Sequence, residues 1–211
     1  MNLYAIPPIV CALLFGWAGL FVYSKNTKAW TNKLFALICL TTVLWQGTWF
    51  VLFQFPHPKL ILPLIKLGYT SIIFIPIALY HFSVSFLQAE KEKRFLWPVY
   101  LVGLFFLIML HTSDFYIKGS YQYFFGFYPK ASLVLHPIYL GFLTAVGGRA
   151  IYLFFFLGQA PSLSIEKQKQ CRLLFVAFCI YTMAAVDFLV NYGVEFYPFG
   201  FVFILIGLGI I

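Results

Sequence analysis

Charged side chains are scarce in this sequence, and acidic ones are the scarcest. Only 9% of the 211 residues are charged and 6 are Asp or Glu, whereas 63% are hydrophobic. A soluble domain carries far more charge on its surface. Because apolar runs recur along nearly the whole chain, no room is left for a second, soluble domain. We therefore expect a single membrane-embedded domain over residues 1–211.

Paired cysteines and metal-binding spacings are also missing. The four cysteines, Cys11, Cys39, Cys171 and Cys179, lie in or beside apolar runs and form no Cys-x-x-Cys pattern. This spacing gives no support for a disulfide framework or a zinc site. We interpret the cysteines as small packing residues and predict neither a metal nor a cofactor.

The sequence lacks the short motifs that mark common catalytic sites. It has no Walker-type glycine loop, no His-Glu-x-x-His and no Gly-x-Ser-x-Gly. The four histidines, His57, His81, His111 and His136, are scattered, and none lies in a phosphoacceptor motif. We therefore predict that this chain alone is not an enzyme.

Apolar runs dominate what is present. A helix needs about 20 apolar residues to cross a bilayer. We predict an all-α, polytopic membrane protein built as a bundle of seven transmembrane helices, at residues 3–23, 34–55, 60–87, 95–111, 132–158, 173–192 and from 199 onward. The seventh run ends at Ile211 and, at about 1.5 Å per residue, is too short to cross. We therefore expect helix 7 to be truncated and the chain to be a fragment.

The basic residues predict the topology. Lysines and arginines gather in the connections 25–33, 88–94 and 159–172, while fewer lie on the opposite side. The positive-inside rule makes these three connections cytoplasmic and places the N-terminus outside. The net charge of +8 is explained by this topology, so we predict no nucleic-acid partner.

Asp187 is the strongest functional candidate because a carboxylate inside a bilayer costs at least a few kcal/mol. In an α-helix, Asn191 lies on the same face one turn later. Gly193 can end that helix, and Pro198 suits the first turn of the next. Two roles for Asp187 stay open. It is a structural group satisfied by a hydroxyl or indole of a neighbouring helix, or it contacts a ligand or proton that biases helix 7.

Two further segments carry candidate residues. Pro76 is expected to kink the third helix beside Tyr80 and His81, which either line a cavity or form an ordinary buried polar contact. The outer segment 111–130 alternates Tyr and Phe around Gly119 and predicts a hairpin-like structure. That hairpin is either an aromatic belt at the membrane surface or a lid over a pocket.

Several of these motifs together resemble the N-terminal 7TM region of bacterial membrane histidine kinases. Asp187, Asn191-Tyr192-Gly193 and Tyr197-Pro198-Phe199-Gly200 are similar to that family's junction between helices 6 and 7. Four other stretches are similar to the family. They are the basic loop followed by Asn32-Lys33-Leu34-Phe35-Ala36, Trp45-Gln46-Gly47 with one residue fewer between Trp and Gly than in the family, Pro76 with His81-Phe82, and the Gln-rich segment 164–170.

The resemblance implies a sensory input domain in a bacterial inner membrane. A small-molecule or lipid-borne signal would pass through helix 7 to a cytoplasmic kinase or other output domain, and a homodimer is compatible with this. Asp187, Asn191, His81 and Tyr80 are the ligand-binding or signalling candidates. Pro76, Gly193, Pro198 and Gly200 are the structural candidates at the helix junctions. The alternative is a small membrane transporter or channel, although no internal repeat is evident.

Overall fold

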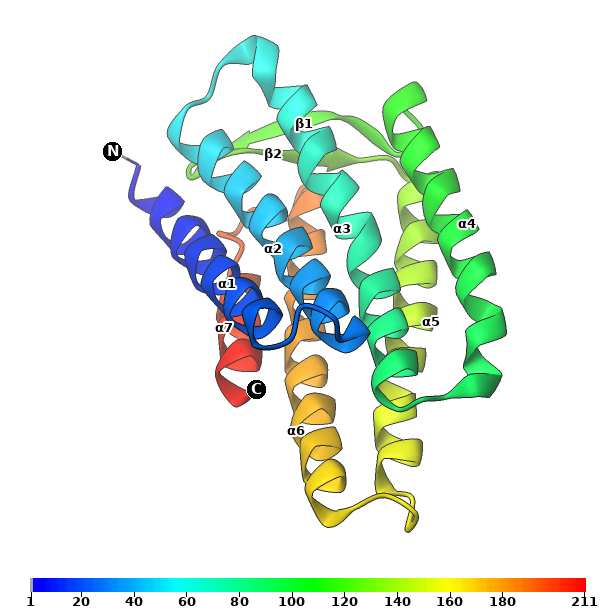
Figure 1. The fold of residues 1–211 in the computed structure, drawn as a ribbon. Coiled ribbons are helices and arrows are strands. Elements are labelled where there is room, and N and C mark those ends of the chain that lie inside the picture. The colour runs from blue at the N-terminus through cyan, green and yellow to red at the C-terminus, as the bar shows by residue number, and fades with distance from the viewer. Residues whose placement is uncertain (1) are drawn as a thin grey trace.

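The computed structural model describes residues 2–211 as a helical bundle with a two-stranded sheet across one end (Figure 1). The helices are η1 (Leu3–Ala5), α1 (Ile6–Lys25), α2 (Trp30–Gln54), α3 (Pro58–Phe86), α4 (Glu90–Thr112), α5 (Leu135–Phe156), η2 (Leu157–Gln159), α6 (Ile165–Thr182), η3 (Met183–Tyr192) and α7 (Gly200–Ile210). The strands are β1 (Ile117–Tyr123) and β2 (Gly126–Ala131).

The predicted seven-helix membrane bundle is confirmed. Within residues 2–211, six helical segments are long and apolar enough to cross a membrane, and α7 is a shorter apolar helix of 11 residues. Helix α7 packs against both α6 and α1, so the two ends of the chain lie in neighbouring helices (Figure 1).

Three helices begin well before the apolar runs that predicted them. α2 starts at Trp30, α4 at Glu90 and α6 at Ile165. The predicted bounds follow hydrophobicity, but Lys, Glu and Gln are good helix formers and can extend a helix beyond the hydrocarbon core. Ser164 adds a specific start signal, because its hydroxyl accepts a hydrogen bond from the Lys167 amide. The basic connections are therefore shorter than expected.

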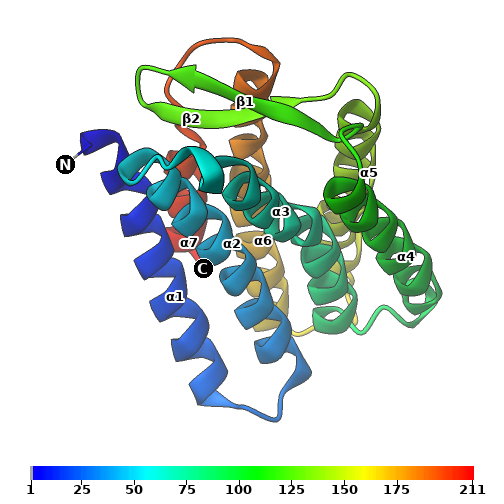
Figure 2. The same ribbon diagram turned by 90° about the horizontal axis from the view of Figure 1, so that it is seen from above.

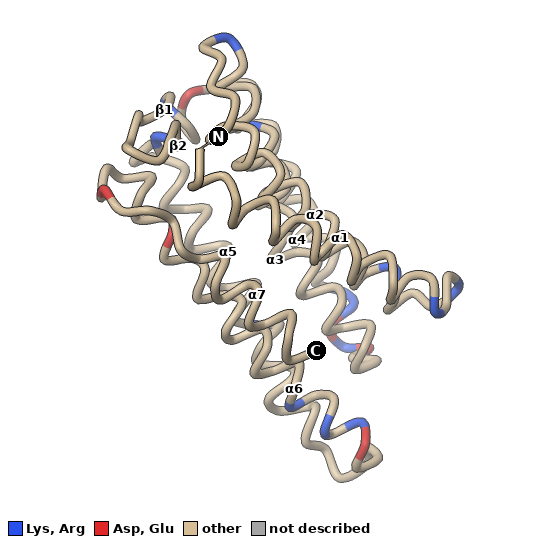
Figure 3. The backbone as a smooth tube through the Cα atoms, turned by 90° about the vertical axis from the view of Figure 1, so that its left-hand side faces the viewer, with Lys and Arg blue, Asp and Glu red and all other residues tan. Residues whose placement is uncertain are grey.

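The charged residues divide between the two ends of the bundle, with an uncharged stretch between them (Figure 3). We call the end with the α1–α2, α3–α4 and α5–α6 connections the basic end, and the end covered by β1 and β2 the hairpin end (Figure 1). This division is what a membrane-spanning bundle requires, because charge is stable only near water and headgroups.

The hairpin predicted for the long connection is present, but its turn is elsewhere. β1 and β2 pair antiparallel, with Tyr123 opposite Gly126, so the turn is Phe124-Phe125 (Figure 2). Gly119 lies within β1, next to an irregularity in the pairing. Gly126 follows the turn as the first residue of β2, where its φ of +143° suits glycine and a Cβ would lie 2.9 Å from the Phe53 ring.

Candidate functional site

Asp187 lies at the junction between η3 and α7, and its partner is a backbone amide. The Gly200 N–H, at the start of α7, donates to Asp187 Oδ1 and Oδ2 over 2.9 and 3.0 Å. The first amides of a helix have no partner within it and carry partial positive charge, so they favour a carboxylate. One of the two roles left open for Asp187 named a hydroxyl or indole partner, and the structure has a backbone amide in its place. The carboxylate instead caps a helix that begins 13 residues later.

Two glycines shape this junction. Gly193 ends η3 with φ +94°, as predicted for a helix terminator. At Gly200, a Cβ would collide with the Asp187 carboxylate and lie 2.9 Å from the Ala184 carbonyl oxygen. Pro198, which we placed in the first turn of the last helix, precedes it instead, because α7 starts at Gly200 after Phe199.

The predicted single α-helix is wrong in its second half. From Met183 to Tyr192 the chain forms a 3₁₀ helix of 10 residues, which is long for this conformation. With roughly three residues per turn, residues 187 and 191 no longer lie on one face. Accordingly, Asp187 and Asn191 bond different partners, although both line one small cavity.

Asn191 begins a chain of neutral hydrogen bonds between helices. Its Nδ2 donates to the Tyr69 hydroxyl on α3 at 2.7 Å. Tyr69 and His136 Nε2 on α5 are 3.0 Å apart, and His136 Nδ1 and the Tyr192 hydroxyl are 2.7 Å apart. One assignment satisfies the chain. Tyr69 donates to Nε2, and Nδ1–H of a neutral imidazole donates to Tyr192. Tyr69, His136 and Tyr192 were not among the predicted site residues.

The hairpin packs directly on this region. Tyr116 and Tyr128 are buried, and the Tyr128 ring centre lies 5.5 Å from that of Trp49. The Tyr123 hydroxyl donates to the Val190 carbonyl oxygen at 2.9 Å, which fixes β1 to η3. Burial raises the pKa of the Tyr116 and Tyr128 phenols well above their ordinary values, so both stay protonated. The hairpin therefore adds inward-facing side chains to the bundle as well as surface aromatics.

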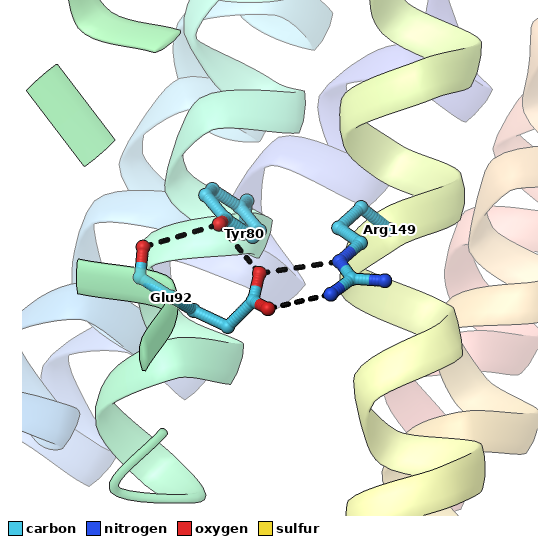
Figure 4. Close-up of polar contacts among 3 residues, drawn as sticks. All are labelled: Tyr80, Glu92 and Arg149. Atoms are coloured by element: carbon cyan, nitrogen blue, oxygen red, sulfur yellow. Dashed lines mark hydrogen bonds and ion pairs between the residues drawn. The ribbon is translucent and has the colours of Figure 1, made fainter. Parts of the chain in front are cut away.

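Tyr80 and His81 point to different partners near the basic end. The Tyr80 hydroxyl donates to Glu92 Oε2 at 2.9 Å, and Arg149 donates from Nε and Nη2 to the two Glu92 oxygens over 3.1 and 2.5 Å (Figure 4). His81 instead bonds the Tyr100 hydroxyl and accepts from Trp30 Nε1. Both residues therefore make ordinary polar contacts, one of the two alternatives left open, but with separate partners.

The ion pair of Glu92 and Arg149 was missed at the sequence level. It joins α4 to α5, and Tyr80 adds α3 (Figure 4). A signal was available, because Arg149 lies inside the apolar run 138–156 and an arginine at such a position needs a partner. A cleft of about 350 Å³ opens beside the pair.

His, Cys, Asp and Glu side chains form no metal-binding group in the described part of the chain. Among residues 2–211, no three of them come together in a way that could hold a metal ion. Cys11, Cys39 and Cys171 are buried and unpaired.

In a comparison with known families, the model of the N-terminal 7TM region of histidine kinase matches residues 7–211 of this chain. This chain belongs to that family. The match confirms the predicted resemblance. The sites described above therefore have to be interpreted as parts of the 7TM region of a membrane histidine kinase. No curated protein and no solved structure matches the chain.

Proposed function

We propose that this 7TM region is a sensory input domain that passes a ligand or membrane signal through α7 to a cytoplasmic output domain of the parent protein. One observation carries the proposal. Within a chain of this family, the buried carboxylate of Asp187 on η3 holds the first amide of the last helix. A change in η3 therefore has a direct route to α7.

The proposed mechanism requires two arrangements of this junction. A signal can shift their balance only if it interacts with them differently. Leaving a buried amide or carboxylate without its partner costs about 1–3 kcal/mol, which is also the usual size of coupling between two sites. Making or breaking the bond between Asp187 and Gly200 is thus enough to couple a signal to α7.

The remaining parts of the proposal follow from the family and the charge distribution. The chain lies in a bacterial inner membrane with the hairpin end outside and the basic end in the cytoplasm. Phosphoryl transfer is assigned to other domains of the parent protein. His81 and Tyr80 lie near the basic end, where we assign them a structural role through Tyr100 and Glu92.

The test compares two aspartates in the full-length parent protein with a transcriptional reporter. Asp187→Asn keeps an oxygen that can accept from Gly200 but removes the charge, so the fold should survive while the response changes. Asp114→Asn is the control, because Asp114 is exposed and lies near the hairpin. If Asp187→Asn reaches normal membrane levels and responds like the control, Asp187 has no signalling role.

A further inference from the structure

Four buried side-chain polar atoms have no hydrogen-bond partner within residues 2–211. They are Nε1 of Trp45 and of Trp49 on α2, the Tyr116 hydroxyl and Oδ1 of Asn191 on η3. Trp45 is 7% exposed and Asn191 is 1% exposed. A buried polar group without a partner is costly, so each such group calls for an explanation such as a bound molecule.

Trp45, Trp49 and Asn191 line the same small cavity, which we call the central cavity. Asp187 and Phe188 also line it, and its volume is about 10 Å³. That is close to the space needed for one water molecule, and hence for one hydroxyl group. A hydroxyl can accept from an indole N–H and donate to an amide oxygen at the same time, so one hydroxyl here can serve the Asn191 oxygen and one of the two indoles.

A second cavity, the lateral cavity, adjoins the first. Its volume is about 50 Å³, and the two share Trp45 and Phe188 among their walls. Its other lining is almost wholly apolar, and it reaches partly exposed residues of α5 and η3, Leu143 and Ala185.

Gly147 on α5 leaves room in the lateral cavity. It is buried and lines the cavity, yet a Cβ placed on it would meet no atom within 4 Å. Gly148 also has open space at its Cβ, but it is exposed and does not line the cavity. The two glycines therefore form a matched pair for a filling experiment.

We propose that the central and lateral cavities together bind an uncharged aliphatic molecule with one hydroxyl group. The hydroxyl of the ligand lies between Trp45 and Asn191, and its aliphatic chain extends between α5 and η3 toward the lipid. A charged head group is disfavoured because the one acidic residue of the lining, Asp187, is already bonded to the Gly200 amide, and burial of a charge costs far more than burial of a hydroxyl. This inference deepens the proposed function, since Asp187 forms part of the same wall.

The test is photolabelling of the purified chain in phosphatidylcholine nanodiscs with a diazirine-bearing octanol. Adducts are located by peptide mass spectrometry. We expect saturable labelling of α5 and η3 that 1-octanol suppresses. Octane and octyl methyl ether should compete at least about tenfold more weakly, because neither can make both hydrogen bonds.

Variants locate the site. Gly147→Leu fills the lateral cavity and should abolish saturable labelling, while Gly148→Leu should label like the wild type. Trp45→Phe removes the indole donor and should weaken competition by 1-octanol about tenfold. Trp97→Phe, at an indole that is 75% exposed, should leave competition unchanged. If Gly147→Leu does not fold, the tryptophan pair still decides.

Several results would overturn the assignment. If octyl methyl ether competes as well as 1-octanol, the two cavities bind only an apolar chain. If octylamine competes more strongly than 1-octanol, the ligand is a cation. Absence of saturable labelling means that the cavity holds water alone. Each of these outcomes is independent of the reporter response of Asp187→Asn. The ligand assignment can therefore be refuted while the proposed function stands, and the proposed function can be refuted while the ligand assignment stands.

Discussion

The two ends of the bundle solve the problem of polar groups in a membrane in different ways. At the hairpin end, Asn191, Tyr69, His136 and Tyr192 form a neutral chain, and the one carboxylate, Asp187, is paired with a helix N-terminus. At the basic end, Glu92 is paired with a true cation. The Arg149 side chain there is 46% exposed, whereas Asp187 is 6% exposed.

This difference indicates where the molecule is able to respond. The ion pair of Glu92 and Arg149 fixes α4 to α5. Water and headgroups can reach this pair, so solvent screens the attraction between the two charges. A carboxylate that depends on the backbone of another helix ties its own energy to the position of that helix. The hairpin end therefore couples a buried polar group to α7, and the basic end serves as a clamp.

The largest expected effect concerns which end faces outward. A membrane-impermeant thiol reagent applied from the outside should label Ser120→Cys on β1 above the wild-type background and should not label Gln88→Cys in the α3–α4 connection. Both positions are exposed. Labelling of residue 88 and not 120 would reverse the topology and move the clamp to the outside.

Removal of the cation should produce the largest loss of stability. Arg149→Ala leaves the Glu92 carboxylate, whose side chain is only 10% exposed, without its ion-pair partner. We expect a loss of about 2 kcal/mol in the free energy of unfolding, below the range for fully buried pairs because Arg149 is half exposed. Denaturant unfolding in mild micelles measures this loss. Arg172→Ala, on exposed Arg172, is the control, and an equal effect would refute the clamp.

A methyl group at the start of α7 should be nearly as harmful. Gly200→Ala places a Cβ against the Asp187 carboxylate and the Ala184 carbonyl oxygen. Overpacking of this kind costs about 1–3 kcal/mol. In the same unfolding assay, Gly209→Ala on α7 should cost nothing, because its Cβ meets no atom within 4 Å. Similar stability of the two variants would show that η3 and α7 are not closely packed.

Loss of one hydrogen bond from the neutral side-chain network at the hairpin end should reduce the free energy of unfolding least. Tyr192→Phe removes the hydroxyl 2.7 Å from His136 Nδ1 and should cost about 1 kcal/mol, the usual net value of one hydrogen bond. Tyr152→Phe, at an exposed tyrosine of α5, is the control. If the cost of Tyr192→Phe exceeds that of Arg149→Ala, then the hairpin end, rather than the basic end, is the main polar source of stability.

The sequence predicted the helices, the family and the need of Asp187 for a partner, because these depend on hydrophobicity, motif order and the cost of an intramembrane charge. It could not predict the partner of Asp187, since a backbone amide such as that of Gly200 leaves no mark in the residue pattern. The ion pair of Glu92 and Arg149 joins residues 57 positions apart, and only the packing of α4 and α5 against α3 brings them together.

The same limit explains the hairpin turn. Alternating Tyr and Phe predicted the strands, but the turn position depends on contacts from outside the hairpin. The Asn2 side chain donates to the Phe125 carbonyl oxygen at 2.8 Å, and Phe125 packs edge to face on Phe53. These contacts favour a turn at Phe124-Phe125 over one at Gly119.

The central claim is that Asp187 holds the start of α7 to η3, and hydrogen exchange tests it most directly. Asp187→Ala should remove the acceptor of the Gly200 amide, so peptides that contain the start of α7 should exchange faster than in the wild type. Asp114→Ala should exchange like the wild type. Unchanged protection of α7 in Asp187→Ala, in a folded chain, would contradict the account.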